Sequence, residues 1–112
     1  MEPGEASILT QLRRGVIEHG VLALVAGEPK YGLDIARTLH DAGLLESEGT
    51  LYPVLSRLRK RELVTTTWAE SPSGPPRRYY ALTPSGRQAL TNFRAEWILF
   101  RDSVDSVIGA TS

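Results

Sequence analysis

Residues 47–63 read SEGTLYPVLSRLRKREL, and this stretch decides the fold. Its apolar residues fall at positions i, i+3, i+4 and i+7, the spacing of one buried stripe along a helix: Leu51, Val54, Leu55 and Leu58. The opposite side of the helix carries Gly49, Tyr52, Pro53, Ser56, Arg57 and Lys60. Ser47 is placed to cap the helix through its hydroxyl, and Pro53 predicts a loose first turn or a late start. One face of this helix therefore suits a protein core, and the other suits a DNA groove.

The flanking sequence predicts two helices before this stretch and a hairpin after it. The first helix covers about residues 8–26, and the second covers about 32–41, with Gly43 just beyond its end. Gly15 and Gly20 each cost the first helix about 1 kcal/mol relative to alanine, so we expect tertiary packing to bury it well. Residues 63–70 and 77–83 are rich in β-branched and aromatic residues and predict two strands, joined by a turn at SPSGPP, residues 71–76.

The C-terminal part predicts one long helix, which Thr83 caps and Pro84 begins. Its apolar residues are spaced alternately by three and four positions, as in a coiled-coil seam: Leu90, Phe93, Trp97, Phe100, Val104 and Val107. We predict that this seam is a dimer interface. The fold class is therefore mainly α with a β-hairpin wing: a winged helix-turn-helix domain over residues 8–83, followed by a dimerisation helix over residues 84–109.

Composition narrows the possible functions of this 112-residue chain. It has no cysteine, no apolar run long enough to cross a membrane and no signal-peptide pattern, so we expect a soluble cytoplasmic protein. His19 and His40 lie on different predicted helices without a ligand set, and no catalytic motif is present, so no enzyme activity, metal or cofactor is predicted. The net charge is zero, yet residues 57–87 carry seven basic and two acidic residues, a net +5. The chain can therefore present a basic side.

Four segments together resemble the PadR-like family of transcriptional regulators. They are LRRGVIEHGVLALV (12–25), YGLDIARTL (31–39), SEGTLYPVLSRLRKRELV (47–64) and GPPRRYYALTPSGRQAL (74–90). The resemblance implies a homodimeric winged-helix repressor that dimerises through its last and first helices, and it implies release of repression by a small molecule. The short chain with one C-terminal helix is similar to the smaller subfamily. Glu62 departs from the pattern, because glycine is expected in the turn after the third helix.

We predict that the third helix and the wing contact double-stranded DNA. Tyrosine and serine hydroxyls can bond phosphates or base edges, and arginine can bond guanine through two donors. Arg77 and Arg78 point to opposite faces of a strand, so only one is expected to reach a phosphate. Arg59 and Arg61 point sideways, toward either an acidic residue or a phosphate. The predicted DNA-binding residues are Ser47, Thr50, Tyr52, Pro53, Ser56, Arg57, Lys60, Arg77 and Arg78.

Aromatic residues on the strands and the last helix have other predicted roles. Trp68, Tyr79 and Tyr80 are expected to pack within the sheet. For Trp97 two interpretations stay open: a plain dimer contact, or one wall of a slot between subunits that binds a planar aromatic molecule together with Phe93 and Phe100.

The main functional hypothesis is a sequence-specific DNA-binding regulator, a repressor, that acts as a homodimer on an inverted-repeat operator and is released by an aromatic effector. A winged-helix module that binds protein instead of DNA is the alternative, and a small-ligand carrier is a third.

Overall fold

The computed structural model describes residues 8–109. Helix α1 (Ile8–Leu24) leads through the short strand β1 (Lys30–Tyr31) to α2 (Gly32–Asp41), and a 3-10 turn η1 (Glu48–Thr50) leads into α3 (Leu51–Lys60). Strands β2 (Val64–Ala69) and β3 (Arg77–Leu82) form the hairpin, and α4 (Pro84–Val104) continues as a π-helical turn η2 (Asp105–Gly109). The predicted fold class is confirmed, a winged helix followed by a long helix. None of the helices within residues 8–109 is long and apolar enough to span a membrane.

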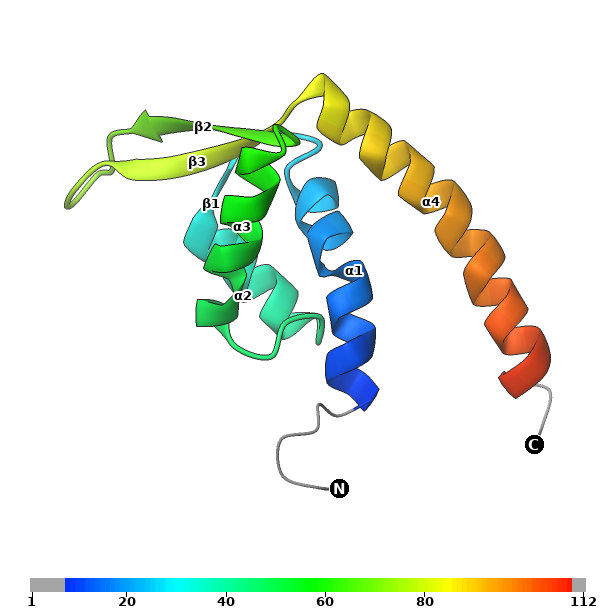
Figure 1. The fold of residues 1–112 in the computed structure, drawn as a ribbon. Coiled ribbons are helices and arrows are strands. Elements are labelled where there is room, and N and C mark those ends of the chain that lie inside the picture. The colour runs from blue at the N-terminus through cyan, green and yellow to red at the C-terminus, as the bar shows by residue number, and fades with distance from the viewer. Residues whose placement is uncertain (1–7, 110–112) are drawn as a thin grey trace.

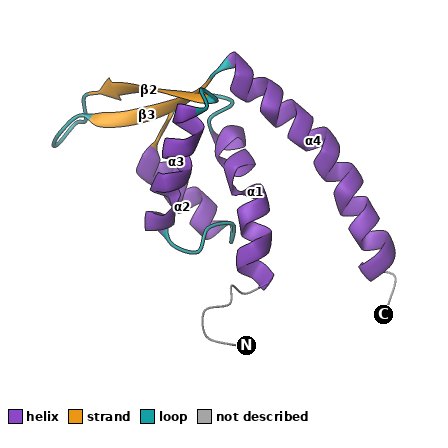
Figure 2. Ribbon diagram, viewed as in Figure 1, coloured by secondary structure: helices purple, strands orange, loops and turns teal. Residues whose placement is uncertain are grey.

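Helices α1, α2 and α3 pack together beside the sheet, and the hairpin projects from them as a wing (Figures 1 and 2). The sheet has three antiparallel strands in the order β1-β3-β2, with Thr66 opposite Tyr80 and Trp68 opposite Arg78 in the hairpin. Strand β1 was not predicted, because two residues are too few to show an alternating pattern. It fixes the start of α2 to the wing.

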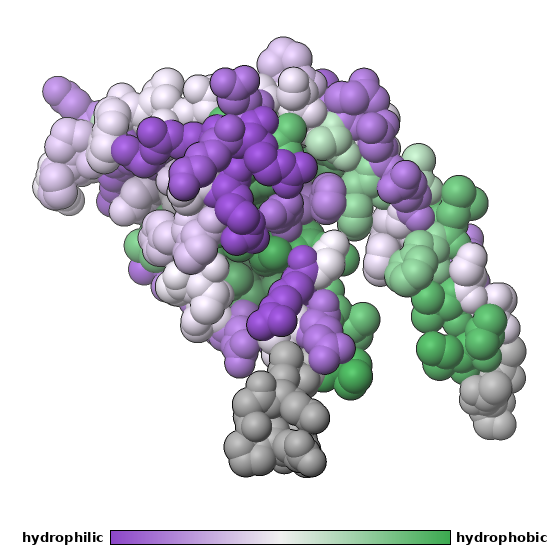
Figure 3. Space-filling view, viewed as in Figure 1, coloured by the Kyte–Doolittle hydropathy of each residue, from purple (hydrophilic) through white to green (hydrophobic). Residues whose placement is uncertain are grey.

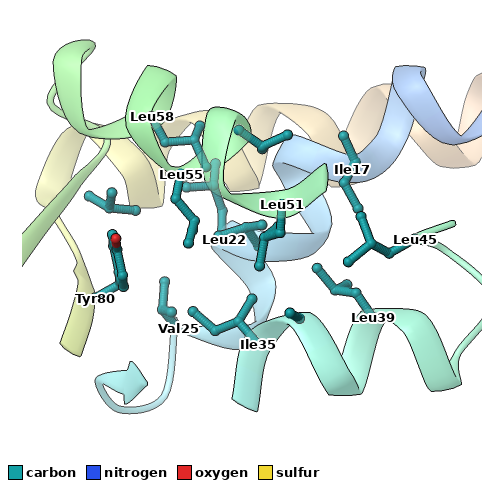
Figure 4. Packing of buried hydrophobic residues seen from close by; sticks show 14 of the residues in the cluster. Ile17, Leu22, Val25, Ile35, Leu39, Leu45, Leu51, Leu55, Leu58 and Tyr80 are labelled. Atoms are coloured by element: carbon teal, nitrogen blue, oxygen red, sulfur yellow. The ribbon is translucent and has the colours of Figure 1, made fainter. Parts of the chain in front are cut away.

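The core lies where the three helices meet the base of the wing (Figure 4). The apolar stripe of α3 is almost entirely buried, so the spacing in the sequence assigned its inner face correctly. The stripe packs against Ile17, Val21 and Leu22 of α1, Ile35 and Leu39 of α2, and Tyr80 of the wing.

The N-terminal half of α1 differs from the prediction that this helix is well buried. Leu9 is 52% exposed and Leu12 is 62% exposed, whereas Val21 and Leu22 are fully buried. Only the C-terminal half of α1 packs on α2 and α3. The two glycines of α1 are therefore not explained by uniform burial: Gly20 lies close to Leu39, while Gly15 has open space beside it.

The turns that end α2 and α3 share one geometry. In each, two backbone N–H groups donate back into the last helical turn, Gly43 N to His40 O and Leu44 N to Leu39 O after α2, and the equivalent pair after α3. The residue at the left-handed position is Gly43 (φ 81°) in the first turn and Glu62 (φ 59°) in the second. The prediction for Gly43 is confirmed, and Glu62 adopts the turn that glycine was expected to make.

The start of α4 is tied to the end of α3 through Thr83. Its hydroxyl accepts from the N–H of Gly86 at 2.9 Å and donates to the carbonyl of Glu62 at 2.7 Å. The predicted cap is thus confirmed, with Pro84 in the first turn. Gly86 lies so close to the Leu63 carbonyl that a Cβ would overlap it. These contacts fix the direction in which α4 leaves the wing.

Candidate nucleic-acid interface

The solvent-exposed side of α3 carries the residues that the sequence predicted. Tyr52, Pro53, Ser56, Arg57 and Lys60 are all exposed, while the stripe on the other side is in the core. Tyr52 leaves 49% of its surface exposed although its ring is largely apolar. Lys60 makes no ion pair within residues 8–109. Its ammonium group is therefore available to a phosphate.

The N-terminal end of α3 differs from the prediction in how it is capped. Ser47 is extended, and its hydroxyl makes no cap hydrogen bond; instead its carbonyl accepts from the backbone N–H of Thr50 at 3.2 Å and from the Thr50 hydroxyl at 2.7 Å. The cap role assigned to Ser47 was wrong, because the 3-10 turn inserted before α3 moves the helix start three residues along the chain, from Glu48 to Leu51. Pro53 then lies in the first turn, where its missing N–H removes no helical bond.

Arg57 and Arg61 lean toward α1 and share the carboxylate of Glu18. Arg57 Nε donates to Glu18 Oε1 at 3.2 Å, and Arg61 Nη1 donates to Glu18 Oε2 at 2.9 Å. Arg61 therefore has the acidic partner that was one of its two expected contacts, and a phosphate contact of its remaining donors stays a prediction. Arg57 was expected to point straight outward, and it lies instead on the flank of the face. Sequence reasoning did not find Glu18, which is 39 residues from Arg57 in the chain.

A hollow of about 470 Å³ separates this flank of α3 from the N-terminal half of α1. Thr50, Pro53 and Arg57 line it from α3 and the turn before it, and Arg13 and Arg14 line it from α1. The predicted DNA-binding residues of α3 therefore divide into two groups. Tyr52, Ser56 and Lys60 form the outward face, and the others border the hollow.

The wing places its two arginines on opposite faces, as strand geometry predicted. The Arg77 guanidinium lies 4.7 Å from the ring centre of Tyr31, and the Arg78 guanidinium lies 4.8 Å from that of Trp68. Trp68 is 64% exposed, so its assignment to sheet packing was wrong. Such stacked pairs fix the direction of a guanidinium while leaving most of its donors available.

The tyrosines of β3 fit the sheet-packing prediction. Tyr80 is buried in the core, and the Tyr79 ring lies 6.0 Å from that of Tyr31 on the opposite face.

Hydrophilic and apolar residues separate over the surface (Figure 3). Strongly hydrophilic residues gather over α3 and the base of the wing, and apolar residues gather on the facing sides of α1 and α4 toward their free ends. Between those two helices lies a groove of about 640 Å³. Its lining is mainly apolar and includes Leu9, Leu12, Val16, Phe93, Trp97 and Phe100.

The predicted dimer seam divides between the core and the groove. Leu90 is only 3% exposed and belongs to the core of its own chain, so its assignment to the dimer interface is corrected. The coiled-coil spacing could not distinguish a core contact from a dimer contact, because the N-terminal part of the same apolar stripe of α4 packs against the core of its own chain. Trp97, Phe100 and Val107 are exposed, and Phe93 and Val104 are half-buried.

A ladder of rings joins α1 to α4 at the closed end of the groove. The His19 ring stacks on Phe93 with centroids 4.0 Å apart, and Phe93 stacks on Trp97 at 6.1 Å. Burial lowers the pKa of His19 below its usual value, and Arg61 lowers it further, against the opposing effects of Glu18 and Glu96. The lowered pKa favours the neutral form of the His19 ring. Within residues 8–109 no group of acidic, histidine or cysteine side chains is arranged to hold a metal ion.

The comparison with known proteins agrees with this geometry. The model of the "Transcriptional regulator PadR-like family" matches residues 21–92, which contain α2, α3 and the wing. The chain belongs to the PadR-like family. PadR-like regulators are DNA-binding proteins with a winged helix, so the predictions of family, fold and DNA-binding transcription regulation are confirmed. A module that binds only protein is not favoured.

Individual relatives resemble the chain over most of its length. The chain is 33% identical to transcriptional regulator Rv3488 of Mycobacterium tuberculosis over 86 residues, which cover 77% of this chain and 79% of the relative. A PadR-like transcription factor from Bacteroides fragilis is 40% identical, with a TM-score of 0.72 over 87% of this chain and 94% of its own. A PadR-like regulator from Bacillus cereus is 32% identical, with a TM-score of 0.79 over 88% and 96%.

Proposed function

We propose that this protein is a homodimeric, sequence-specific repressor whose α3 enters the major groove of an inverted-repeat operator. The observation that carries the proposal is the outward face of α3, where Tyr52, Ser56 and Lys60 lie opposite a fully buried stripe and beside a wing with two stacked arginines. A helix of this kind fits the major groove, and a wing reaches the adjoining backbone. A DNA-binding role also agrees with the cytoplasmic location predicted from the sequence.

The apolar surface that one chain leaves exposed supports the proposed dimer. Around the C-terminal half of α4, Ile98 (49% exposed) and Leu99 (70%) lie outside the predicted seam and are also apolar. Exposed apolar side chains gathered in this way mark an interaction surface, so we propose that α4 of a second chain and the exposed half of α1 cover it. A two-fold dimer reads two half-sites about 10 base pairs apart centre to centre, or a multiple of that spacing.

Selection of bound sequences from a random DNA pool would give the operator, and two variants then test α3. Lys60→Ala should weaken binding to all sequences and flatten the salt dependence by about one unit, because it removes a phosphate contact. Arg57→Ala should instead change the preferred base at one position, by about 1–3 kcal/mol. Lys30→Ala is the matched control, because Lys30 lies on β1 and is paired with Glu28 at 2.8 Å. If the α3 variants bind like the control, the proposed interface is wrong.

The groove between α1 and α4 supports the proposal of an aromatic effector. Phe93, Trp97 and Phe100 give it flat apolar walls, and a planar molecule between them would alter how α4 sits on its partner. A different position of α4 would change the distance between the two α3 helices of the dimer. That distance must match the spacing of the half-sites, so the affinity for the operator would change as well. The Trp68→Phe variant leaves Trp97 as the only indole. Planar aromatic compounds that shift its fluorescence and release DNA would support this role, and a panel without any effect would refute it.

A further inference from the structure

Glu18 joins α1 to the DNA-facing helix by a contact that the family assignment does not explain. Its side chain is 23% exposed, and each of its two oxygens accepts from a different arginine: Arg57 of α3 at 3.2 Å, and Arg61, the residue that caps the end of α3, at 2.9 Å. These arginines are four residues apart, at the last turn of α3 and its cap, so both lie on the side that faces α1. One carboxylate thus holds two of the cations that border the proposed DNA interface.

The geometry leaves both guanidinium groups able to bind something else. Arg57 is held through Nε, so its two terminal nitrogens keep their donors; Arg61 is held through Nη1, so Nη2 and Nε keep theirs. Their side chains are 55% and 59% exposed. The carboxylate therefore orients the arginines without blocking them.

The orientation of the two arginines and the charge of Glu18 have different effects on binding to arbitrary DNA and on binding to the operator. Binding to arbitrary DNA depends on the number of free cations, and Glu18 cancels one of the two positive charges beside it. Binding to the operator also depends on geometry, and an arginine that is already held loses less conformational freedom when it contacts a base. A carboxylate at this position therefore lowers the affinity for arbitrary DNA more than it lowers the affinity for the operator.

We propose that Glu18 is a specificity-determining residue, which positions Arg57 and Arg61 for the operator and suppresses their attraction to arbitrary DNA. This inference rests on the proposed α3 interface. The selectivity of α3 for its operator then depends in part on a residue of α1.

The test measures affinity for the selected operator and for a scrambled duplex of equal length, over a range of salt concentrations. Glu18→Gln should raise affinity for the scrambled duplex roughly fivefold to tenfold at 0.1 M salt and steepen its salt dependence by about one unit, since one more cation reaches phosphate. Affinity for the operator should rise less, so the ratio of the two affinities falls. Glu48→Gln is the matched control: it changes the net charge equally, but Glu48 contacts Arg37, at 3.9 Å, and not the two α3 arginines.

A second variant separates position from charge. Glu18→Asp keeps the carboxylate but shortens it by one methylene, so affinity for the operator should fall while affinity for the scrambled duplex stays low. An unchanged affinity ratio in both Glu18 variants would overturn the proposal, and so would Glu48→Gln lowering the ratio as much as Glu18→Gln. If the parent protein itself does not distinguish the selected sequence from the scrambled one, it is the proposed function that fails.

Discussion

At the scale of single residues, the two similar turns after α2 and α3 give a direct comparison of glycine with glutamate. Glu62 occupies a left-handed conformation (φ 59°) that costs an L-residue about 1–2 kcal/mol, whereas Gly43 (φ 81°) adopts it freely. Glu62→Gly should therefore raise the free energy of unfolding, by about 0.5–1 kcal/mol once the greater freedom of glycine in the unfolded chain is subtracted. Urea unfolding followed by circular dichroism measures the change.

Gly43→Ala is the reciprocal control, because the same strain is then introduced after α2, and it should lower the free energy of unfolding by about 1 kcal/mol. The bond from the Thr83 hydroxyl to Glu62 uses the backbone carbonyl, so it survives in the Glu62→Gly variant. A loss of stability in Glu62→Gly would mean that the glutamate side chain contributes more than the turn strain removes.

At the scale of the elements, the sequence predicted what depends on local pattern and missed what depends on contacts distant in the chain. The stripe of α3, the cap at Thr83 and the turn at Gly43 each have a signal within a few residues. The exposure of half of α1 has no such signal, because an apolar residue looks the same in sequence whether its partner is its own chain or another. The pairing of Glu18 with Arg57 of α3 and Arg61 at its end likewise has no local signal in the sequence.

The contact between α1 and α4 predicts a pH dependence of stability. His19 stacks on Phe93, and its folded-state pKa lies below the usual value because of burial. At a pH between the folded-state pKa and the unfolded-state pKa of about 6.5, the unfolded chain binds more protons than the folded one. The free energy of unfolding therefore decreases as pH falls through about 6.5, and this decrease ends below the folded-state pKa. His19→Phe keeps a ring against Phe93 and cannot titrate, so this part of the pH dependence should disappear.

Thermal unfolding between pH 5 and 8 measures the effect, with His40→Gln as the control. His40 is an exposed residue of α2, and its replacement removes a histidine without touching α4. If His19→Phe and the parent lose stability in parallel over this range, His19 is not the group responsible.

At the scale of the whole molecule, one chain presents two surfaces with opposite character. Hydrophilic residues cover α3 and the base of the wing, and an apolar groove opens between the free ends of α1 and α4 (Figure 3). The ladder from His19 through Phe93 to Trp97 closes one end of the groove. Since α4 is fixed at its start by Thr83, whatever fills the groove sets the position of its far end relative to α3.

The proposed dimer can be tested at Phe100, which is 63% exposed and lines the groove. Phe100→Asp places a charge in the apolar interface, where it has no partner, and should produce monomers at micromolar concentration, as measured by light scattering. Thr91→Asp introduces the same charge on the exposed side of α4 opposite the seam and should leave the dimer intact. A monomeric variant contacts DNA with only one α3, so its affinity for the inverted repeat should be no higher than its affinity for an isolated half-site. The dimeric parent binds both half-sites at once and should therefore have a higher affinity for the inverted repeat. A Phe100→Asp protein that stays dimeric would show that the chains associate through another surface.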